Sequence, residues 1–582
     1  MAYFSGKRKQ LTDIDIQEMF FNSDEEEEYN TDASSSDDSD GEGLPPNLED
    51  LANPEAEGPS SEGEMEMGDE VEEVSSTSWW AASDFTPPGP RVVFNETLSG
   101  VQTPPEDPTE AQCFKLFLTE ELVEEIVEET NRYASVQQEM MPSGVKGKIA
   151  KWVRTTVNEM YSFLVAVLLM GIVRKSSLRD YWTTDPILLT PFFATIFSQD
   201  RFLLLLRCLH FVDSASANVN DPLHKIRNVF SALTTSFQRV FVPHRDLCVD
   251  ESLMKWKGRL AFRQYIPSKR HRFGVKFFVL CDVLTGYVQD MIIYTGSTTD
   301  ITHFPGLGIS GSVVMTLLAP HLKKGHVLYI DNWYSSPTLF QHLLSLGTGA
   351  CGTVRANRKG MPAFSPKMKK GEVEFKQNGS QLAVKWHDKR DVHMLTTVHS
   401  SVMSATARID HATGERKLKP ACVLDYNKKM GAVDKADMVN SFVECARKTT
   451  KWYKKVFFHL VDTAVLNGHI VHRQQSGRVI PYQEYRLNLM KQLLEVHHTP
   501  RRPSTGGRPT SDNPLWLTAR HFPSEVPQTA TQGSRTRRKC KVCTSTSRRR
   551  KERKVTKFMC VACNVALCAA PCFEEYHTLK HY

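Results

Sequence analysis

Residues 246–296 constrain the fold more than any other stretch of this chain. An apolar run, Leu247-Cys248-Val249, is followed directly by two carboxylates, Asp250 and Glu251. A basic segment then leads to two long β-branched and aromatic runs that meet at Thr285-Gly286. Apolar runs bounded by turn residues are typical of strands joined in a hairpin. The stretch therefore predicts sheet strands, with an acid at a strand edge and positive charge around it.

Asp250 has two interpretations. An acid at the end of a strand is often an ordinary surface residue. Alternatively, a carboxylate that holds a divalent metal beside a polyanion-binding surface is what phosphodiester chemistry requires. The second interpretation draws on the basic side chains that follow in the sequence: Lys255, Lys257, Arg259, Arg263, Lys269, Arg270 and Arg272.

The net charge of +5 hides an uneven distribution along the 582 residues. Residues 21–80 hold 21 of the 67 acidic side chains and no Lys or Arg, so the remainder carries 72 basic against 46 acidic residues. An acidic arm on a basic body favours a nucleic-acid-binding protein. The longest apolar stretch, residues 160–173, is too short to span a bilayer, and no signal peptide opens the chain, so we expect a soluble intracellular protein.

The order of composition and periodicity predicts a multidomain α/β protein. Low-complexity acidic sequence predicts a disordered arm, and apolar residues at helical spacing after Thr119, a plausible N-cap, predict a helical part. The Asn378-Gly379 turn between alternating runs predicts a β-rich insertion. The expected segments are an arm (1–110), a helical part (111–245), a core (246–356), the insertion (357–418), the last core helix (419–442), a second helical part (443–498), a linker (499–536) and a cysteine-rich end (537–582).

Three further candidate carboxylates, at two places in the chain, follow Asp250. Asp331 ends an apolar strand, and Ser336-Pro337 then gives an N-cap and a first helical residue. An acid at the carboxyl end of a parallel-type strand lies where α/β sheets place their sites. If a helix begins near Gly431, Asp434 and Asp437 share one of its faces.

The cysteine-rich end has the spacing of metal ligands. Six of the thirteen cysteines lie after residue 539, and two histidines follow them. Four pairs at short spacing fit two tetrahedral zinc sites: Cys540 and Cys543, Cys560 and Cys563, Cys568 and Cys572, His577 and His581. By analogy with interleaved zinc modules the first pair would join the third and the second the fourth, although a sequential arrangement is possible. The twelve Lys and Arg of residues 535–557, among them Arg548, Arg549 and Arg550, suit a nuclear localisation signal, a phosphate clamp, or both.

Five motifs in order resemble the piggyBac family of DNA transposases from about residue 110 to the end of the chain. They are VDESL (249–253), YIPSKRHRFGVK (265–276), YIDNWYSS (329–336), GTVRANRKG (352–360) and YNKKMGAVDKAD (426–437). The resemblance implies an RNase H-like catalytic core interrupted by an insertion domain, flanked by a helical dimerisation and DNA-binding domain, with a cysteine-rich domain that contacts the DNA of the element's ends. It also implies excision through DNA hairpins and insertion at TTAA.

By position, the resemblance implies that Asp250, Asp331 and Asp434 are catalytic aspartates and that Asp437 is a fourth acid close to them. Such carboxylates suit two Mg²⁺ or Mn²⁺ ions. Arg355 and Arg358 match basic residues important for integration, and Lys359 adjoins them. Trp452 matches an aromatic position near the active site; aromatics among basic residues stack on bases, but a tryptophan is as often a core anchor. We expect double-stranded DNA as partner, a homodimer, nuclear localisation and no membrane association.

Two other classes of function remain open from the sequence. A domesticated protein could keep the fold and bind DNA without transposition, although intact carboxylates argue against it. The zinc module could instead serve a ubiquitin-ligase-like or histone-reading adaptor. The terminal His577 and His581 and the basic loop favour DNA contact over that alternative.

Overall fold

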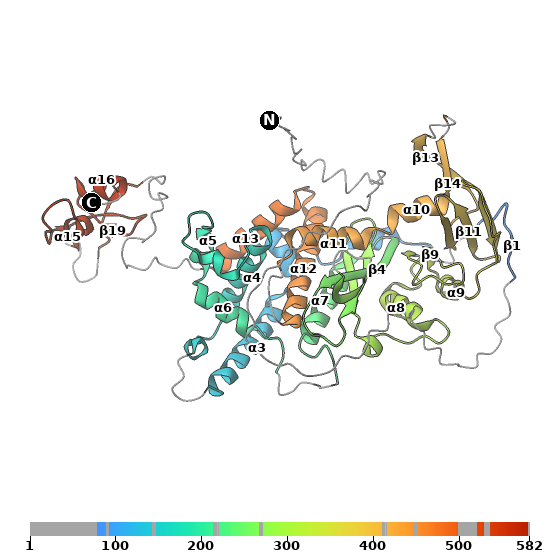
Figure 1. The fold of residues 1–582 in the computed structure, drawn as a ribbon, viewed down its shortest axis with the longest axis horizontal. Coiled ribbons are helices and arrows are strands. Elements are labelled where there is room, and N and C mark those ends of the chain that lie inside the picture. Colours follow the sequence, from blue (N-terminus) through green and yellow to red (C-terminus); the bar gives the residue numbers. More distant parts are fainter. Residues whose placement is uncertain are drawn as a thin grey trace, which may run out of the picture. The chain divides into compact units, whose positions relative to one another are not determined.

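A computed structural model describes residues 78–88, 92–141, 147–213, 218, 220–266, 272–409, 414, 416–445, 451–498, 521–528, 536–579 and 582 (Figure 1). These residues form two compact units. The first contains the described residues up to 93 together with 304–311 and 321–431. The second contains the described residues of 94–303, 312–320 and 432–582. No described helix is both long enough and apolar enough to cross a membrane.

The first unit is built on a mixed sheet. Its strands lie in the order β1-β10-β11-β12-β9-β8. Only β8 and β9 of this series run parallel, and the helix α9 connects them. The bounds are β1 (Trp80–Ala81), β8 (Val327–Ile330), α9 (Pro337–Ser345), β9 (Gly349–Thr353), β10 (Val373–Gln377), β11 (Leu382–His387) and β12 (Asp391–Thr396).

Local signals in the sequence locate several of these elements. The Ser336 hydroxyl accepts a hydrogen bond from the amide of Leu339, so Ser336 is the predicted N-cap of α9. The chain leaves this helix at Gly347, whose φ of 69° suits glycine. A hairpin (β13, Met403–Ile409, and β14, Arg416–Pro420) and the helix α10 (Ala421–Lys429) complete the unit. The helix α8 (Gly308–Leu318) begins among first-unit residues and ends among second-unit residues.

Two expectations about domain boundaries need correction. The strands of the predicted insertion, residues 357–418, continue the sheet of the preceding core, because β12 pairs antiparallel with β9. The predicted structureless arm, residues 1–110, is wrong for residues 78–88. Here β1 pairs with β10, and Ala82 and Phe85 are buried in the unit. A strand of two residues carries too little periodicity to be recognised in a sequence.

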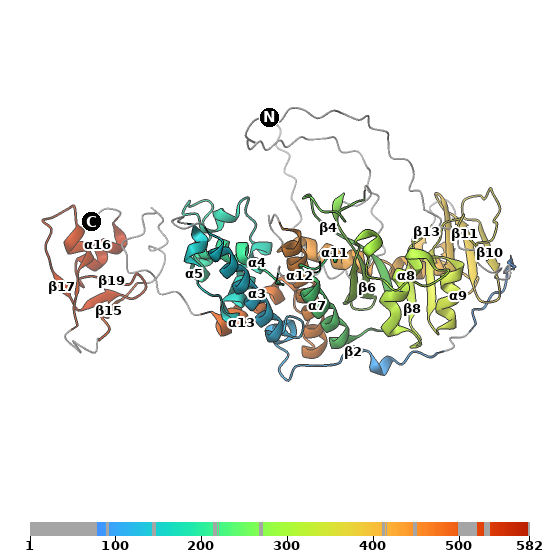
Figure 2. The same cartoon turned by 90° about the horizontal axis from the view of Figure 1, so that it is seen from below.

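The second unit combines a strand layer with a set of packed helices (Figure 2). β6 pairs antiparallel with β4, β5 and β7, and the chain turns between β6 and β7 at Gly286, as predicted. The strands are β2 (Gly100–Val101), β3 (Phe241–Val242), β4 (Asp246–Lys255), β5 (Gln264–Tyr265), β6 (Phe273–Asp282) and β7 (Val288–Ile293). β4 continues well past Val249, so Asp250 lies inside a strand rather than at its end.

The helices of the second unit pack around α12. α12 contacts α2, α7, α11 and α13, while α7 covers β7, and α4 packs against α13 and α3. From Met160 onward α4 is buried on nearly all sides because its sequence there is almost entirely apolar. The helices are α2 (Glu110–Lys115), α3 (Glu120–Glu139), α4 (Val157–Ile172), α5 (Pro191–Ile196), α6 (Gln199–Cys208), α7 (Arg227–Val240), α11 (Ala432–Val443), α12 (Trp452–Ser476) and α13 (Tyr482–His497).

The cysteine-rich module is a small fold of short elements. β15 pairs with β18, β18 with β19, and β16 with β17. The elements are β15 (Pro523–Glu525), β16 (Arg538–Lys539), α15 (Lys541–Ser545), β17 (Val555–Thr556), β18 (Phe558–Cys560), β19 (Val565–Ala566) and α16 (Cys572–Thr578). Because β15 belongs to this fold, the predicted linker, residues 499–536, is wrong over residues 521–528.

Candidate functional site

Three of the predicted acids lie together in the second unit, where α11 packs on β4 and β6. Cys248, Asp250 and Ser252 alternate along β4 and therefore share one face of it. The buried hydroxyl of Ser252 donates a hydrogen bond of 2.8 Å to Oδ1 of Asp437, so this face is turned toward α11.

The first turn of α11 is fixed against the same face. The backbone amides of Ala432 and Val433 hydrogen-bond to the Cys248 thiol, which is fully buried. Burial raises the pKa of this thiol, and the charges of Asp250 and Asp434 raise it further. Cys281, opposite Cys248 in the register of β4 and β6, is likewise affected by Asp250 and Asp437. The charges of all three carboxylates therefore act on one pair of buried thiols.

These carboxylates differ in their access to solvent. Asp434 is exposed, whereas Asp250 and Asp437 are half-buried. Asp250 accepts a hydrogen bond from the amide of Glu251 at 2.9 Å. Grouped carboxylates, partly accessible, can bind a hard divalent cation. Glu251 points to the other face of β4, where Lys276 lies 3.2 Å from its carboxylate.

A buried ion pair holds the far end of α11. Arg486 of α13 and Asp462 of α12 are both almost inaccessible and lie 3.1 Å apart. Arg486 also donates to the carbonyl of Val443, the last residue of α11, and Asp462 accepts from the amide of Cys445. This pair therefore holds the C-terminal end of α11 against α12 and α13.

Asp331 belongs to the first unit and directly follows β8, as predicted. It is half-buried; its Oδ1 accepts the amide of Trp333 at 2.8 Å, and its carbonyl accepts the Ser335 hydroxyl at 2.9 Å. Since Asp331 and the other three acids lie in different units, their meeting in one site stays a prediction.

The predicted DNA-contacting residues fall into three groups. Arg272, Arg355, Lys359, Arg548 and Arg550 are exposed, whereas Lys269 and Arg270 lie outside the described residues. Two arginines have partners within the protein: Arg358 donates to the carbonyls of Asn332 and Trp333, beside Asp331, and Arg549, although exposed, pairs with Glu575. Trp452 is half-buried with its ring 5.3 Å from that of the buried Phe262, so it packs at least partly as a core residue.

The cysteine-rich module brings its ligand atoms into two clusters, each within 4.8 Å. The first is Cys540, Cys543, Cys568 and Cys572. Cys543 Sγ lies 3.5 Å from Cys572 Sγ and 3.9 Å from Cys568 Sγ. A tetrahedral zinc with bonds of about 2.3 Å requires sulfur–sulfur separations of about 3.8 Å. The donor set therefore fits zinc, and the interleaved pairing predicted for these four residues agrees with the structure.

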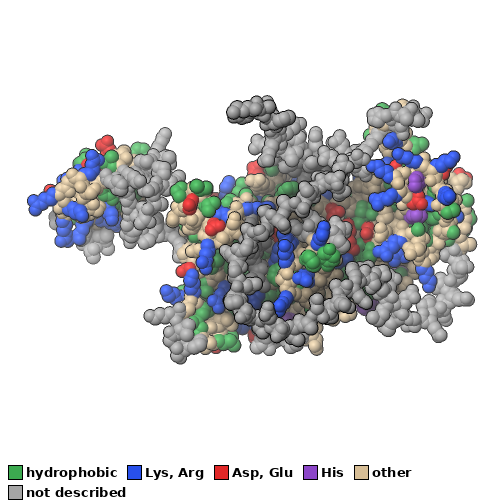
Figure 3. Space-filling model, viewed as in Figure 1, with side chains coloured by type: hydrophobic (Ala, Val, Ile, Leu, Met, Phe, Trp, Pro, Cys, Tyr) green, Lys and Arg blue, Asp and Glu red, His purple; other side chains and the backbone are tan. Residues whose placement is uncertain are grey.

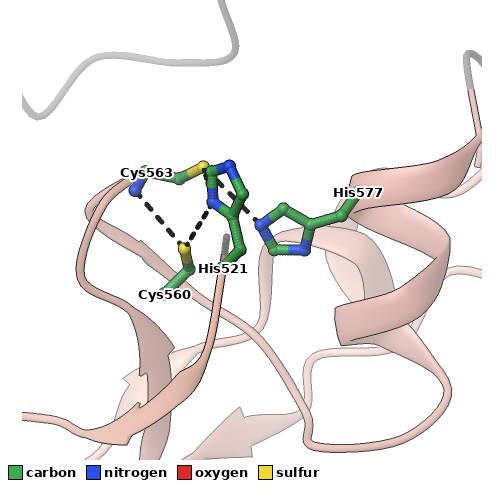
Figure 4. Close-up of side chains that lie close together, drawn as sticks. All are labelled: His521, Cys560, Cys563 and His577. Atoms are coloured by element: carbon green, nitrogen blue, oxygen red, sulfur yellow. Dashed lines mark hydrogen bonds between the residues drawn. The ribbon is translucent and has the colours of Figure 1, made fainter. Parts of the chain in front are cut away.

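The second cluster is His521, Cys560, Cys563 and His577 (Figure 4). His521 Nδ1 lies 3.2 Å from Cys560 Sγ and 3.3 Å from Cys563 Sγ, and His577 Nε2 lies 3.6 Å from Cys563 Sγ. Nδ1 of His577 lies 2.6 Å from the Phe573 carbonyl, an arrangement that leaves Nε2 for a metal. Sequence reasoning missed His521, and the predicted His581 lies outside the described residues.

Metal ligands make up much of the module's interior. Its buried core consists of Cys540, Val542, Cys543, Cys560, Leu567, Cys572, Tyr576 and Tyr582. All thirteen cysteines of the chain are free of disulfides. A core so rich in ligand sulfur has little apolar area of its own, so its stability must come largely from bound metal.

Comparison with known proteins places this geometry in a family. The model of a family described as transposase IS4 matches residues 109–469, and that of a DDE_Tnp_1-like zinc finger matches residues 523–578. Human PiggyBac transposable element-derived protein 3 is 27% identical over 521 residues, which span 86% of this chain and 81% of that protein. Human PiggyBac transposable element-derived protein 5 is 24% identical over 428 residues, 70% of this chain and 79% of that protein.

A solved structure is also similar. The cryo-EM structure of the piggyBac transposase synaptic complex with hairpin DNA matches with a TM-score of 0.59 at 25% identity. The match covers 82% of this chain and 99% of that one.

Proposed function

Because this chain belongs to the piggyBac family of transposases, we propose that it cuts and joins DNA strands at the ends of a mobile element and inserts the element at TTAA sites. The observation that carries the proposal is the packing of α11, with Asp434 and Asp437, on the strand β4 that holds Asp250, fixed by the hydrogen bond from Ser252 to Asp437. The solved complex with hairpin DNA supports DNA as the substrate.

Asp331 is the proposed fourth member of this site. Asp331 follows the end of β8, a position that suits a metal ligand. Its carboxylate is half-buried and is held in place by the hydrogen bond from the amide of Trp333. The proposal assigns all four acids to the catalytic centre of an RNase H-like core. Asp250, Asp331 and Asp434 are the metal ligands, and Asp437, oriented by Ser252, supports them.

Oxygen ligands of this kind suit Mg²⁺ or Mn²⁺ and are poor ligands for zinc. A pair of such ions supplies activation of the attacking hydroxyl and stabilisation of the departing oxygen. The protein's own contribution is to hold the carboxylates and the DNA in place. The exposed Arg272, Arg355 and Lys359 bind backbone phosphates, mostly without reading bases.

The cysteine-rich module binds two zinc ions and contacts the DNA of the element's ends. Figure 3 shows Lys and Arg side chains gathered over this module, and the exposed Arg548 and Arg550 belong to its basic run. His521 is the proposed fourth ligand of the second zinc. The protein works in the nucleus, as a homodimer that holds two DNA ends.

An excision assay tests the catalytic proposal. Full-length protein is incubated with Mg²⁺ and a plasmid that carries the genomic element encoding this chain, flanked by its own ends. Wild-type protein should release the element. Asp250→Asn, Asp331→Asn and Asp434→Asn should each reduce cleavage by at least about a hundredfold, because each removes a ligand charge from the site. DNA affinity, measured by fluorescence anisotropy, should change little.

The matched control is an acid outside the site. Asp300 is exposed and pairs with Arg227, so Asp300→Asn makes the same chemical change at a distance from the carboxylate cluster and should cleave like the wild type. Wild-type protein that binds the ends without cutting them would overturn the enzymatic proposal. That outcome would favour a DNA-binding protein derived from a transposase, as the names of the human relatives describe those proteins.

A further inference from the structure

The three consecutive arginines 548–550 do not have the same surroundings. All three are exposed in the basic run of the cysteine-rich module. The Arg549 side chain retains 38% of its accessible surface and is engaged by two partners. A run that is uniformly basic in the sequence therefore contains one member with a separate role.

The guanidinium of Arg549 is held in a defined position against the four-cysteine cluster. Nη1 and Nη2 donate to the two carboxylate oxygens of Glu575 at 2.7 and 2.8 Å. Nη2 also donates to Sγ of Cys572 at 3.3 Å. Glu575 lies three residues after Cys572 on α16, so both partners lie on the same side of that helix. The two hydrogen bonds to Glu575 therefore hold the positive guanidinium beside the sulfur of Cys572.

From this geometry we propose that Arg549 is a positioning residue of the four-cysteine metal site and contributes little to DNA binding. The inference rests on the proposed zinc. Four thiolates around one divalent cation leave an excess of two negative charges, and a charged donor held beside one of the sulfurs offsets part of that excess. The hydrogen bond from the amide of Cys568 to the sulfur of Cys540, in the same cluster, uses a neutral donor.

The expected loss of zinc affinity follows from what is known of groups that hydrogen-bond to metal ligands. Loss of a group that hydrogen-bonds a ligand typically lowers metal affinity about ten- to a hundredfold. A phosphate contact has a different signature, because each one adds about 0.9 to the slope of log affinity against log salt concentration. The two roles can therefore be measured independently on the same variant.

The experiment uses the full-length protein loaded with Co²⁺, whose visible spectrum separates a four-sulfur site from a two-sulfur, two-nitrogen site. Titration with Zn²⁺ in a chelator buffer then gives the affinity of each site. Arg549→Ala should weaken zinc binding at the four-cysteine site about ten- to a hundredfold and leave the second site within about twofold. Arg550→Ala is the matched control and should leave both sites unchanged.

DNA binding is measured on zinc-saturated protein with a duplex oligonucleotide of arbitrary sequence over a range of salt concentrations. Arg550→Ala should reduce the salt slope by about one phosphate, whereas Arg549→Ala should not change it. Glu575→Gln keeps the Arg549 guanidinium but weakens the two hydrogen bonds that orient it. This variant should therefore lower zinc affinity at the four-cysteine site by a smaller factor than Arg549→Ala does. Glu575→Gln also tests the proposal if Arg549→Ala does not fold.

The inference is overturned if Arg549→Ala binds zinc at the four-cysteine site within about twofold of the wild type, or if it lowers the salt slope as Arg550→Ala does. It is also overturned if Glu575→Gln leaves the affinity unchanged. A wild-type protein that takes up no metal at the four-cysteine site is a different result, because it refutes the proposed zinc itself.

Discussion

The buried pair of Arg486 and Asp462 gives a quantitative prediction about the catalytic helix. In Arg486→Met the Asp462 carboxylate loses its guanidinium and keeps the amide of Cys445 as a donor. Breaking a buried ion pair by removing one partner costs about 3–5 kcal/mol. Burial already raises the pKa of Asp462, with Arg486 opposing that shift, so the variant raises this pKa further and the carboxyl takes up a proton.

The cost should therefore depend on pH. A group whose folded pKa lies above its unfolded value loses its stabilising contribution as the pH rises. Keeping an aspartate neutral costs about 1.4 kcal/mol for each pH unit above about 3.9, which is about 2 kcal/mol at pH 5.5. At pH 8 the same calculation gives about 6 kcal/mol, slightly above the range for a broken pair.

Hydrogen exchange of peptides from α12 and α13, measured at pH 5.5 and 8 and corrected for intrinsic rates, reports this loss. The double variant Arg486→Met/Asp462→Leu removes both charges and should recover stability to within about 1 kcal/mol of the wild type. Arg486→Met should also slow DNA cleavage, because the end of α11 loses its bond from Arg486 to Val443. Equal destabilisation at both pH values, or a double variant no more stable than the single one, would refute the reasoning.

Three further outcomes are expected. Burial raises the pKa of Asp290 to about 6, so the stability gained from its protonated form is lost as the pH rises through 6. In urea unfolding, Asp290→Asn should therefore be more stable than the wild type by up to about 3 kcal/mol at pH 8 and no more stable at pH 4. Ser252→Ala removes the donor to Asp437 and should slow cleavage about tenfold or more, with a higher Mg²⁺ requirement and unchanged DNA affinity. Ser252→Thr keeps the hydroxyl and should retain most of the cleavage activity. Removal of zinc with a chelator should make residues 521–579 sensitive to protease while α12 stays protected, and restoring zinc should reverse this.

Local chemistry made much of the fold predictable. Thr119 and Ser336 cap their helices as expected, because a side-chain oxygen before an apolar periodic run satisfies amides that the helix itself cannot. The hairpin at Asn378-Gly379 follows from residues suited to a tight turn. In each case the signal and its consequence lie within a few residues of each other.

Contacts between distant segments were less accessible to sequence reasoning. The buried run of Leu247-Cys248-Val249 predicted a strand, but not that β4 continues through Asp250 to Lys255. That extension depends on pairing with the whole of β6, and the polar residues within it are turned toward α11 or toward Lys276. The sequence predicted Asp250 and Asp437 as site residues, whereas Ser252, which joins β4 to Asp437, has no feature that separates it from any other serine.

His521 shows what further information would have completed the second metal cluster. Ligand pairs such as Cys560 and Cys563 stand out because two donors a few residues apart can bind one ion, but a single histidine upstream has no such partner. Its place follows from the register of two strands, in which Pro523 lies opposite Cys560 and Ser524 opposite Met559. Extending that register by two residues sets position 521 opposite position 562, between the two cysteines. The ligand was therefore determined by strand pairing, and only a knowledge of which strands meet could have identified it.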